Sequence, residues 1–281
     1  MKKKKLFIEM MVAILVIFLI SSIVIILSIQ QNVFFYPWHD EESYKKLQVT
    51  EKFKEIEIYK DGKKLSGWLK FNTDKEVSPL IIFFGGNMQN SSNTCISFLK
   101  NDNFKYFKDY NFLMVDYPGY GLSEGKPSDK TMFEAGLMVY DYACNLDFID
   151  KNNIAILGYS IGTGVATYVA SNRDVNGLIL IAPYDEALSL YNAYLNIFHG
   201  PLKILAKYKF DSKSYAKNVK IAPLIFTSYD DEVISYKFTL NLEKYFKNVD
   251  KTIILENIKH NDYFSDDSVL NDIFIYLQNR I

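Results

Sequence analysis

Cysteine, histidine and excess charge of either sign are scarce in this chain of 281 residues. Its two cysteines, Cys95 and Cys144, fall on different predicted helices, so we expect two buried free thiols and no disulfide framework. The three histidines, at positions 39, 199 and 260, are too scattered to form a metal-binding cluster. Because 32 basic and 33 acidic residues nearly cancel, the chain has no basic field for nucleic acid. We therefore expect no metal and no nucleic-acid partner.

Motifs for nucleotide cofactors are missing as well. Neither G-x-x-x-x-G-K nor G-x-G-x-x-G follows any predicted strand, and these loops hold the phosphates in nucleotide-binding proteins. The chain does contain an ordinary globular share of hydrophobic residues (49%) and of charged residues (23%). That composition excludes a disordered chain, and we expect a folded protein without a cofactor.

The longest hydrophobic run lies at the N-terminus. Met10–Ile29 carries no charge, and a helix of that length spans about 30 Å, the thickness of the hydrocarbon core of a bilayer. The run is longer than the apolar segment of most signal peptides and no small-x-small cleavage site follows it, so we favour an uncleaved signal-anchor over a cleaved signal. Lys2–Lys5 precede the run and predict a cytoplasmic N-terminus. We therefore expect a single-pass membrane protein with a tail at 1–5, a transmembrane helix at 6–29 and an extracytoplasmic body at 30–281.

The body alternates short apolar runs with amphipathic helices. Continuous apolar runs separated by helices are typical of parallel strands in a sheet that is covered on both faces. Upstream of them, Phe53–Tyr59 and Leu65–Phe71 alternate in and out around Asp61-Gly62, which predicts a hairpin at an antiparallel edge of the same sheet. We expect a doubly wound α/β fold with six parallel strands, at Pro79–Gly85, Phe112–Asp116, Ile154–Gly158, Leu178–Ala182, Leu224–Ser228 and Thr252–Glu256.

About forty residues interrupt this alternation before the strand that begins at Leu224. The segment, at about 183–222, is rich in tyrosine and leucine. Insertions of this length above a parallel sheet are usually functional, so we expect a cap or lid. One helix with a long loop is the alternative.

A G-x-S-x-G motif marks the candidate nucleophile. Gly158-Tyr159-Ser160-Ile161-Gly162 lies between a predicted strand and a predicted helix, which is the setting of a nucleophile elbow. Such a serine sits in a strained turn, and the small flanking residues let neighbouring backbone pass close. The sequence therefore predicts that Ser160 is a nucleophile at the carboxyl end of a strand.

The partners of this serine follow in chain order. A serine hydroxyl needs a histidine base held by a carboxylate, and in this architecture the acid precedes the histidine in the chain. His260 follows the last predicted strand, at the same sheet edge as Ser160. For the acid we prefer Asp231, which lies just after another strand and directly precedes Glu232-Val233-Ile234 at the start of a predicted helix, while Asp230 and Glu232 remain alternatives.

Acyl transfer also needs backbone N–H groups that stabilise an oxyanion. One donor is expected from Ile161, the residue after the nucleophile. The second is expected from Asn87 or Met88, in the glycine-rich loop that follows the first parallel strand.

Together these motifs resemble the α/β-hydrolases, specifically membrane-anchored serine hydrolases of the esterase, lipase and thioesterase kind. The resemblance covers residues 34–280 and implies a mostly parallel sheet of about eight strands with Ser160, Asp231 and His260 as the catalytic triad. Phe84-Gly85 stands where many relatives have His-Gly, which leaves the second oxyanion donor open. The matching pieces are Phe34-Phe35-Tyr36-Pro37, Phe84-Gly85-Gly86-Asn87, the run Asp116–Gly125, Gly158–Gly162, Phe210-Asp211-Ser212, Asp231-Glu232-Val233-Ile234 and His260.

The function that follows is hydrolysis of carboxylic ester or thioester bonds through an acyl-enzyme on Ser160. The expected partners are a small-molecule or lipid-like acyl ester and a membrane reached through the N-terminal helix. An amide or peptide hydrolase would use the same triad, and an inactive hydrolase-fold binding module is a further alternative.

Overall fold

A computed structural model describes residues 2–60, 62–72 and 76–280. Its centre is one eight-stranded sheet in the order β1-β2-β4-β3-β5-β6-β7-β8. Strands β1 and β2 form an antiparallel hairpin, β2 pairs antiparallel with β4, and the remaining neighbours are parallel. The strands are β1 (Phe53–Lys60), β2 (Lys63–Lys70), β3 (Ser78–Phe84), β4 (Asn111–Val115), β5 (Ile149–Tyr159), β6 (Gly177–Ile181), β7 (Leu224–Ser228) and β8 (Lys251–Leu255).

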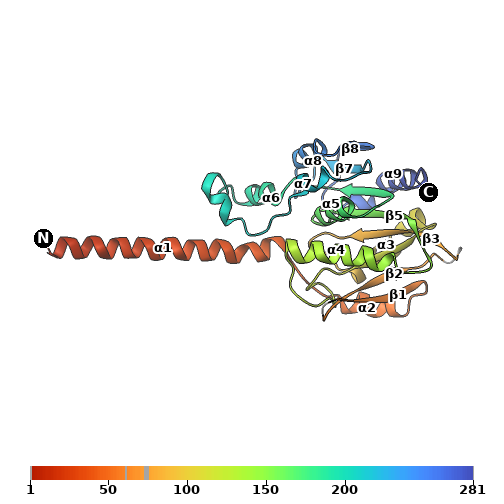
Figure 1. Ribbon diagram of the computed structural model, residues 1–281, viewed down its shortest axis with the longest axis horizontal. Helices are drawn as coiled ribbons and strands as arrows, with labels where there is room; N and C mark the ends of the chain where they lie inside the picture. The colour runs from red at the N-terminus through yellow and green to blue at the C-terminus, as the bar shows by residue number, and fades with distance from the viewer. Residues whose placement is uncertain (1, 61, 73–75, 281) are drawn as a thin grey trace.

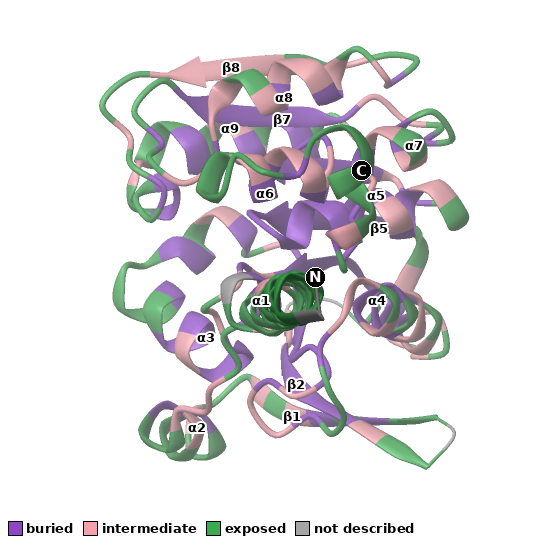
Figure 2. Ribbon diagram, turned by 90° about the vertical axis from the view of Figure 1, so that its left-hand side faces the viewer, coloured by how far each residue is buried: buried purple, intermediate pink, exposed green. Residues whose placement is uncertain are grey.

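Every residue of β3, β4, β6 and β7 is buried, as expected for continuous apolar strands with helices on both faces. Helices α3 and α9 cover one face and α4 and α5 cover the other (Figure 2). The predicted doubly wound sheet with an antiparallel edge is therefore confirmed. The helices are α2 (Glu41–Gln48), α3 (Ser91–Lys100), α4 (Asp129–Ala143), α5 (Gly162–Asn172), α8 (Tyr236–Glu243) and α9 (Asp267–Gln278), with 3₁₀ turns η1 (Asn103–Phe107) and η3 (Tyr263–Ser265).

Several boundaries differ from the sequence-based expectation. Strand β5 begins at Ile149 rather than Ile154, because its first residues pair with Ser78 before an irregularity in the register. Of the predicted hairpin turn, Asp61 lies outside the described residues, and Gly62 has a φ of +74°. Both cysteines are free, but only Cys95 is buried, since Cys144 lies at the partly exposed C-terminal end of α4.

The segment at 183–222 forms three short helices instead of one long helix. They are α6 (Ala187–Tyr194), η2 (Gly200–Leu205) and α7 (Ser212–Ala216). Helix α7 packs on α5 and belongs to the body. Helix α6 and η2 instead project from the sheet edge toward the N-terminal helix (Figure 1).

Helix α1 (Lys2–Phe34) extends away from the body as a single long rod (Figure 1). Its segment Lys3–Asn32 is long and apolar enough to cross a membrane, a property that signal sequences share. The last residues of α1 behave differently, because Gln30, Phe34 and the following Phe35 are buried in the body.

Candidate active site

Ser160 occupies a strained turn between β5 and α5. Its backbone φ is +53°, in the left-handed region that non-glycine residues seldom adopt. Gly162 makes this turn possible, because a Cβ there would lie 2.1 Å from the carbonyl oxygen of Phe84. The strain is balanced by local bonding, since the Ser160 N–H donates to the Ile181 carbonyl at 2.9 Å. The turn lifts the serine side chain to the carboxyl edge of the sheet.

Three side chains from three loops meet at this edge. The Oγ of Ser160 lies 2.9 Å from Nε2 of His260. On the other side of the ring, Nδ1 of His260 lies 2.9 Å from Oδ2 and 3.0 Å from Oδ1 of Asp231. All three residues are buried, with 7–8% of their surface exposed. The structure thus brings together the three residues that the sequence singled out, in a continuous hydrogen-bonded line.

The carboxylate of Asp231 is held from several sides. The backbone N–H groups of Val233 and Ile234 donate to its Oδ1 at 2.9 and 2.8 Å, and the Tyr263 hydroxyl donates to its Oδ2 at 3.0 Å. Burial favours the neutral acid, but the hydrogen bond and charge of His260 and the two N–H groups outweigh it and lower the pKa of Asp231. Because its pKa is lowered, the Asp231 carboxylate stays ionised opposite the imidazole ring.

The two neighbouring acids have other partners. Asp230 turns away and accepts the backbone N–H of Asn257 at 2.7 Å. Glu232 accepts the backbone N–H of His260 at 3.2 Å and so supports the loop rather than the ring. Of the three acids that the sequence left open, only Asp231 contacts the imidazole among the described residues.

Two tyrosines that sequence reasoning missed also position the histidine. The Tyr159 hydroxyl donates to the His260 carbonyl oxygen at 2.6 Å, and its ring stacks on the imidazole at 5.2 Å between centroids. Tyr263, fully buried, donates to Oδ2 of Asp231, the oxygen that also faces Nδ1 of His260. Burial raises the pKa of both hydroxyls, so they act as neutral donors. Tyr159 lies inside the G-x-S-x-G motif, which was the one available signal for it.

The glycine-rich loop after β3 passes directly over the serine. A Cβ at Gly86 would lie 3.5 Å from Cβ of Ser160 and 3.0 Å from the Tyr159 ring. In this loop the side chain of Asn87 is fixed by the backbone N–H of Tyr36 at 2.9 Å and by the Tyr120 hydroxyl at 2.8 Å. The backbone N–H groups of residues 87, 88 and 161 have no hydrogen-bond partner among the described residues. They are therefore available, although their role as oxyanion donors stays a prediction.

A small cleft of about 60 Å³ opens beside Ser160. Its walls are mostly apolar and come from the loop after β7, from α6 and from the end of α1. They comprise Phe34, Asn87, Ile161, Leu190, Tyr194, Val233 and Ile234.

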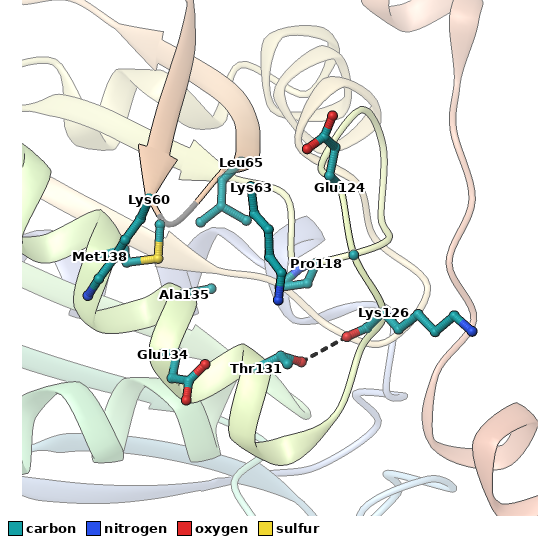
Figure 3. A pocket seen from close by; sticks show the side chains of 11 residues that line it. Lys60, Lys63, Leu65, Pro118, Glu124, Lys126, Thr131, Glu134, Ala135 and Met138 are labelled. Carbon is teal, nitrogen blue, oxygen red and sulfur yellow. Dashed lines mark hydrogen bonds between the residues drawn. The ribbon is translucent and has the colours of Figure 1, made fainter.

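A larger cavity of about 300 Å³ lies elsewhere, between the β1–β2 hairpin, the loop at 116–127 and α4. Figure 3 shows its lysines Lys60, Lys63 and Lys126 around a mixed wall that contains none of the three residues of the hydrogen-bonded line. Within the described part of the chain, no group of three or more His, Cys, Asp or Glu residues could hold a metal.

The loop at 116–125 supports the site without lining the cleft. The buried carboxylate of Asp116 accepts the N–H of Ser91 at 2.6 Å and its hydroxyl at 2.8 Å. Burial raises the pKa of Asp116 to about 6 despite these bonds. Asp116 thus ties the loop to the start of α3.

Comparison with known proteins gives consistent matches. A sequence model of the alpha/beta hydrolase fold matches residues 79–232. The alpha/beta hydrolase domain-containing protein aho-3 of Caenorhabditis elegans is 26% identical over 152 residues, which are 54% of this chain and 44% of that protein. The chain therefore spans less than half the length of this curated relative. The uncharacterized protein YfhR of Escherichia coli O157:H7 is 25% identical over 214 residues, 74% of this chain and 72% of that protein.

Solved structures share the architecture. The esterase Pf2001 of Pyrococcus furiosus superposes with a TM-score of 0.68 at 17% identity, over 88% of this chain and 97% of that one. Est1E from Butyrivibrio proteoclasticus, solved with ferulic acid bound, gives a TM-score of 0.66 at 20% identity, over 80% of this chain and 98% of that one. At these identities the similarity establishes a common fold.

Proposed function

Because the chain belongs to the alpha/beta hydrolase family, we propose that it is a serine hydrolase that cleaves carboxylic ester or thioester bonds. The observation that carries the proposal is the hydrogen-bonded line from Ser160 through His260 to Asp231, with the serine on a strained elbow. Each member has the chemistry that its step requires.

Acylation begins at the serine hydroxyl. Oγ of Ser160 attacks the acyl carbonyl while Nε2 of His260 accepts its proton, and Asp231 stabilises the imidazolium through Nδ1. The tetrahedral oxyanion forms against the N–H of Ile161 and an N–H from the loop at Asn87 or Met88. The imidazolium then protonates the departing alcohol or thiol, which leaves the acyl group on Ser160.

Deacylation repeats the sequence with water. His260 removes a proton from the water molecule, which attacks the acyl-enzyme, and the proton returns to Oγ of Ser160 as the carboxylic acid leaves. The apolar cleft walls Phe34, Leu190 and Tyr194 favour an acyl chain over a charged group.

We propose further that α1 anchors this enzyme in a membrane as a single span, with the N-terminus cytoplasmic and the body extracytoplasmic.

The test is hydrolysis of acyl esters and acyl thioesters of increasing chain length by the full chain in detergent. Ser160→Ala is expected to lower kcat by at least about 10³-fold with unchanged thermal unfolding. Ser171→Ala, near the end of α5, the helix that follows Ser160, is the matched control and should leave kcat unchanged. Comparable turnover by Ser160→Ala and the wild type would refute the proposal.

A further inference from the structure

Helix α1 joins the body without a linker. The buried side chain of Gln30 donates to the Leu205 carbonyl at 2.9 Å and accepts the Lys207 N–H at 2.7 Å. One residue later, Gln31 accepts a hydrogen bond from the Tyr208 hydroxyl. These bonds tie the helix to the segment that contains α6, η2 and the loop after them (187–208), which we call the cap. The direction of α1 therefore fixes how the body faces the membrane that α1 would span.

Aromatic packing continues the junction into the cap. The ring centroids of Phe34 and Tyr191 lie 4.4 Å apart, and the Phe35 ring meets the Tyr208 ring edge-on with 4.7 Å between centroids. Phe34 also forms part of the cleft beside Ser160. The end of the apolar helix is therefore a wall of the catalytic cleft as well as an anchor point.

The cap carries an exposed apolar surface on the side of α1. Figure 1 shows α6 and η2 reaching along α1 toward its N-terminus, and η2 contacts α1. We name the exposed residues of this segment the apolar cap face; its large apolar members are Tyr194, Leu195, Ile197, Leu202 and Ile204.

Exposure of this apolar surface to water is energetically unfavourable. Ile204 is 88% exposed, and five large apolar side chains are exposed within residues 194–204, a concentration that on a folded protein usually marks an interaction site. Exposed Lys203 lies between Leu202 and Ile204, and exposed Lys207 follows three residues later; basic residues of this kind are typical of segments that lie in a membrane interface. A bilayer is therefore the partner whose chemistry fits both the apolar residues and their basic neighbours.

The helix rise gives the depth of this surface. Ile26 of α1 packs against the buried core one turn before Gln30, so the body reaches along α1 to a point about 6 Å closer to the N-terminus than Gln30. That distance matches the 5–10 Å by which interfacial segments enter a membrane. In the other direction, Phe34 lies five residues beyond Ile29, or about 8 Å above the end of the apolar run.

We propose that the apolar cap face is embedded in the leaflet next to α1, and that an acyl lipid ester passes from the bilayer to Ser160 between α1 and α6. The acyl chain of the lipid would move past Tyr194 and Leu190 to Phe34 without crossing water. This inference rests on the proposed function and deepens it, because it identifies the substrate as a membrane-resident acyl ester.

A depth measurement tests the embedding without any enzyme activity. The full chain carrying Cys144→Ser is given one reactive cysteine, Ile204→Cys or the control Val49→Cys, and labelled with an environment-sensitive fluorophore. Val49 is 85% exposed and follows α2, on the sheet edge beside β1. In vesicles of phosphatidylcholine and phosphatidylglycerol with spin-labelled acyl chains, we expect strong quenching at position 204 and little at 49. Equal, weak quenching at both positions would overturn the proposal.

A paired activity assay tests the route. Ile204→Glu should lower kcat/KM at least tenfold for a long-chain acyl ester dissolved in the vesicles, because a charge on this surface opposes embedding. The same variant should keep its turnover of a water-soluble acetyl ester and its labelling by a fluorophosphonate, and Val49→Glu should change neither reaction. If Ile204→Glu lowered the turnover of both esters equally, the route would be refuted. A wild type that shows neither fluorophosphonate labelling nor turnover of either ester would refute the proposed function itself.

Discussion

Replacing Asp231 with asparagine tests the proposed role of His260, because the aspartate and asparagine side chains have the same shape. In the wild type, Oδ1 accepts two backbone N–H groups, from Val233 and Ile234, and Oδ2 faces the Tyr263 hydroxyl and Nδ1 of His260. The asparagine oxygen must take the Oδ1 position, since an amide NH₂ there would oppose two donors. Its NH₂ group is then left about 3 Å from Nδ1 of the ring.

That placement reverses the preferred tautomer of the imidazole ring. An NH₂ donor opposite Nδ1 stabilises the tautomer with its proton on Nε2, and Nε2 lies 2.9 Å from Oγ of Ser160. A protonated Nε2 cannot accept the serine proton. The Nδ1-protonated form that can do so loses the Oδ2 acceptor and keeps only the oxygen at Oδ1, 3.0 Å away and already shared with two backbone N–H groups. We expect kcat to fall about 10⁴-fold, as it does for this change in another triad, which equals about 5 kcal/mol of transition-state stabilisation.

The assay is steady-state hydrolysis of a soluble ester by the full chain in detergent, with thermal unfolding as the check on the fold. Asp230→Asn is the matched control, because that carboxylate bonds only the Asn257 backbone among the described residues, and its kcat should stay within about threefold of the wild type. A tenth or more of wild-type kcat in Asp231→Asn would contradict the tautomer argument. A large loss in Asp230→Asn alone would show that the neighbouring acid has the role assigned to Asp231.

Three further changes have defined outcomes. Tyr263→Phe removes one donor to Asp231. It should lower kcat several-fold and shift the acidic limb of the pH–rate profile to higher pH; an unchanged profile would exclude a positioning role for this hydroxyl. Gly162→Ala places a Cβ 2.1 Å from the Phe84 carbonyl oxygen and should lower both the melting temperature and kcat, so wild-type values for both would contradict the close approach. Because burial raises the folded-state pKa of Asp116 to about 6, above the unfolded value near 4, the folded protein binds this proton more tightly. The free energy of unfolding should therefore fall by up to about 3 kcal/mol between pH 4 and pH 6 relative to Asp116→Asn, as measured by chemical denaturation; parallel curves for the two proteins would disprove it.

The features that sequence reasoning found are local or depend on chain order. The elbow at Ser160 is encoded by its own five residues, and the strand ends that precede Asp231 and His260 are visible as apolar runs. The choice between Asp230 and Asp231 was harder, because adjacent acids in one turn differ only in which way they point. That direction is decided by contacts with residues about thirty positions away, Asn257 and His260.

What the sequence did not reveal are contacts between distant segments. Tyr263 reaches Asp231 across 32 positions, and no local pattern distinguishes it from other aromatic residues of a core. The second role of α1 was missed for a similar reason. Hydrophobicity predicts only that the helix could span a membrane, whereas the burial of Gln30 and Phe34 depends on a segment that follows more than 150 residues later.

The most direct test of the proposed triad is covalent labelling of the full chain by a fluorophosphonate, with the modified residue located by peptide mass spectrometry. We expect a single adduct on Ser160, formed rapidly in the wild type, slowly in Asp231→Asn and not at all in Ser160→Ala. An adduct on another serine, or no labelling of a protein that is folded by its thermal transition, would contradict the claim that this hydrogen-bonded line is a catalytic triad.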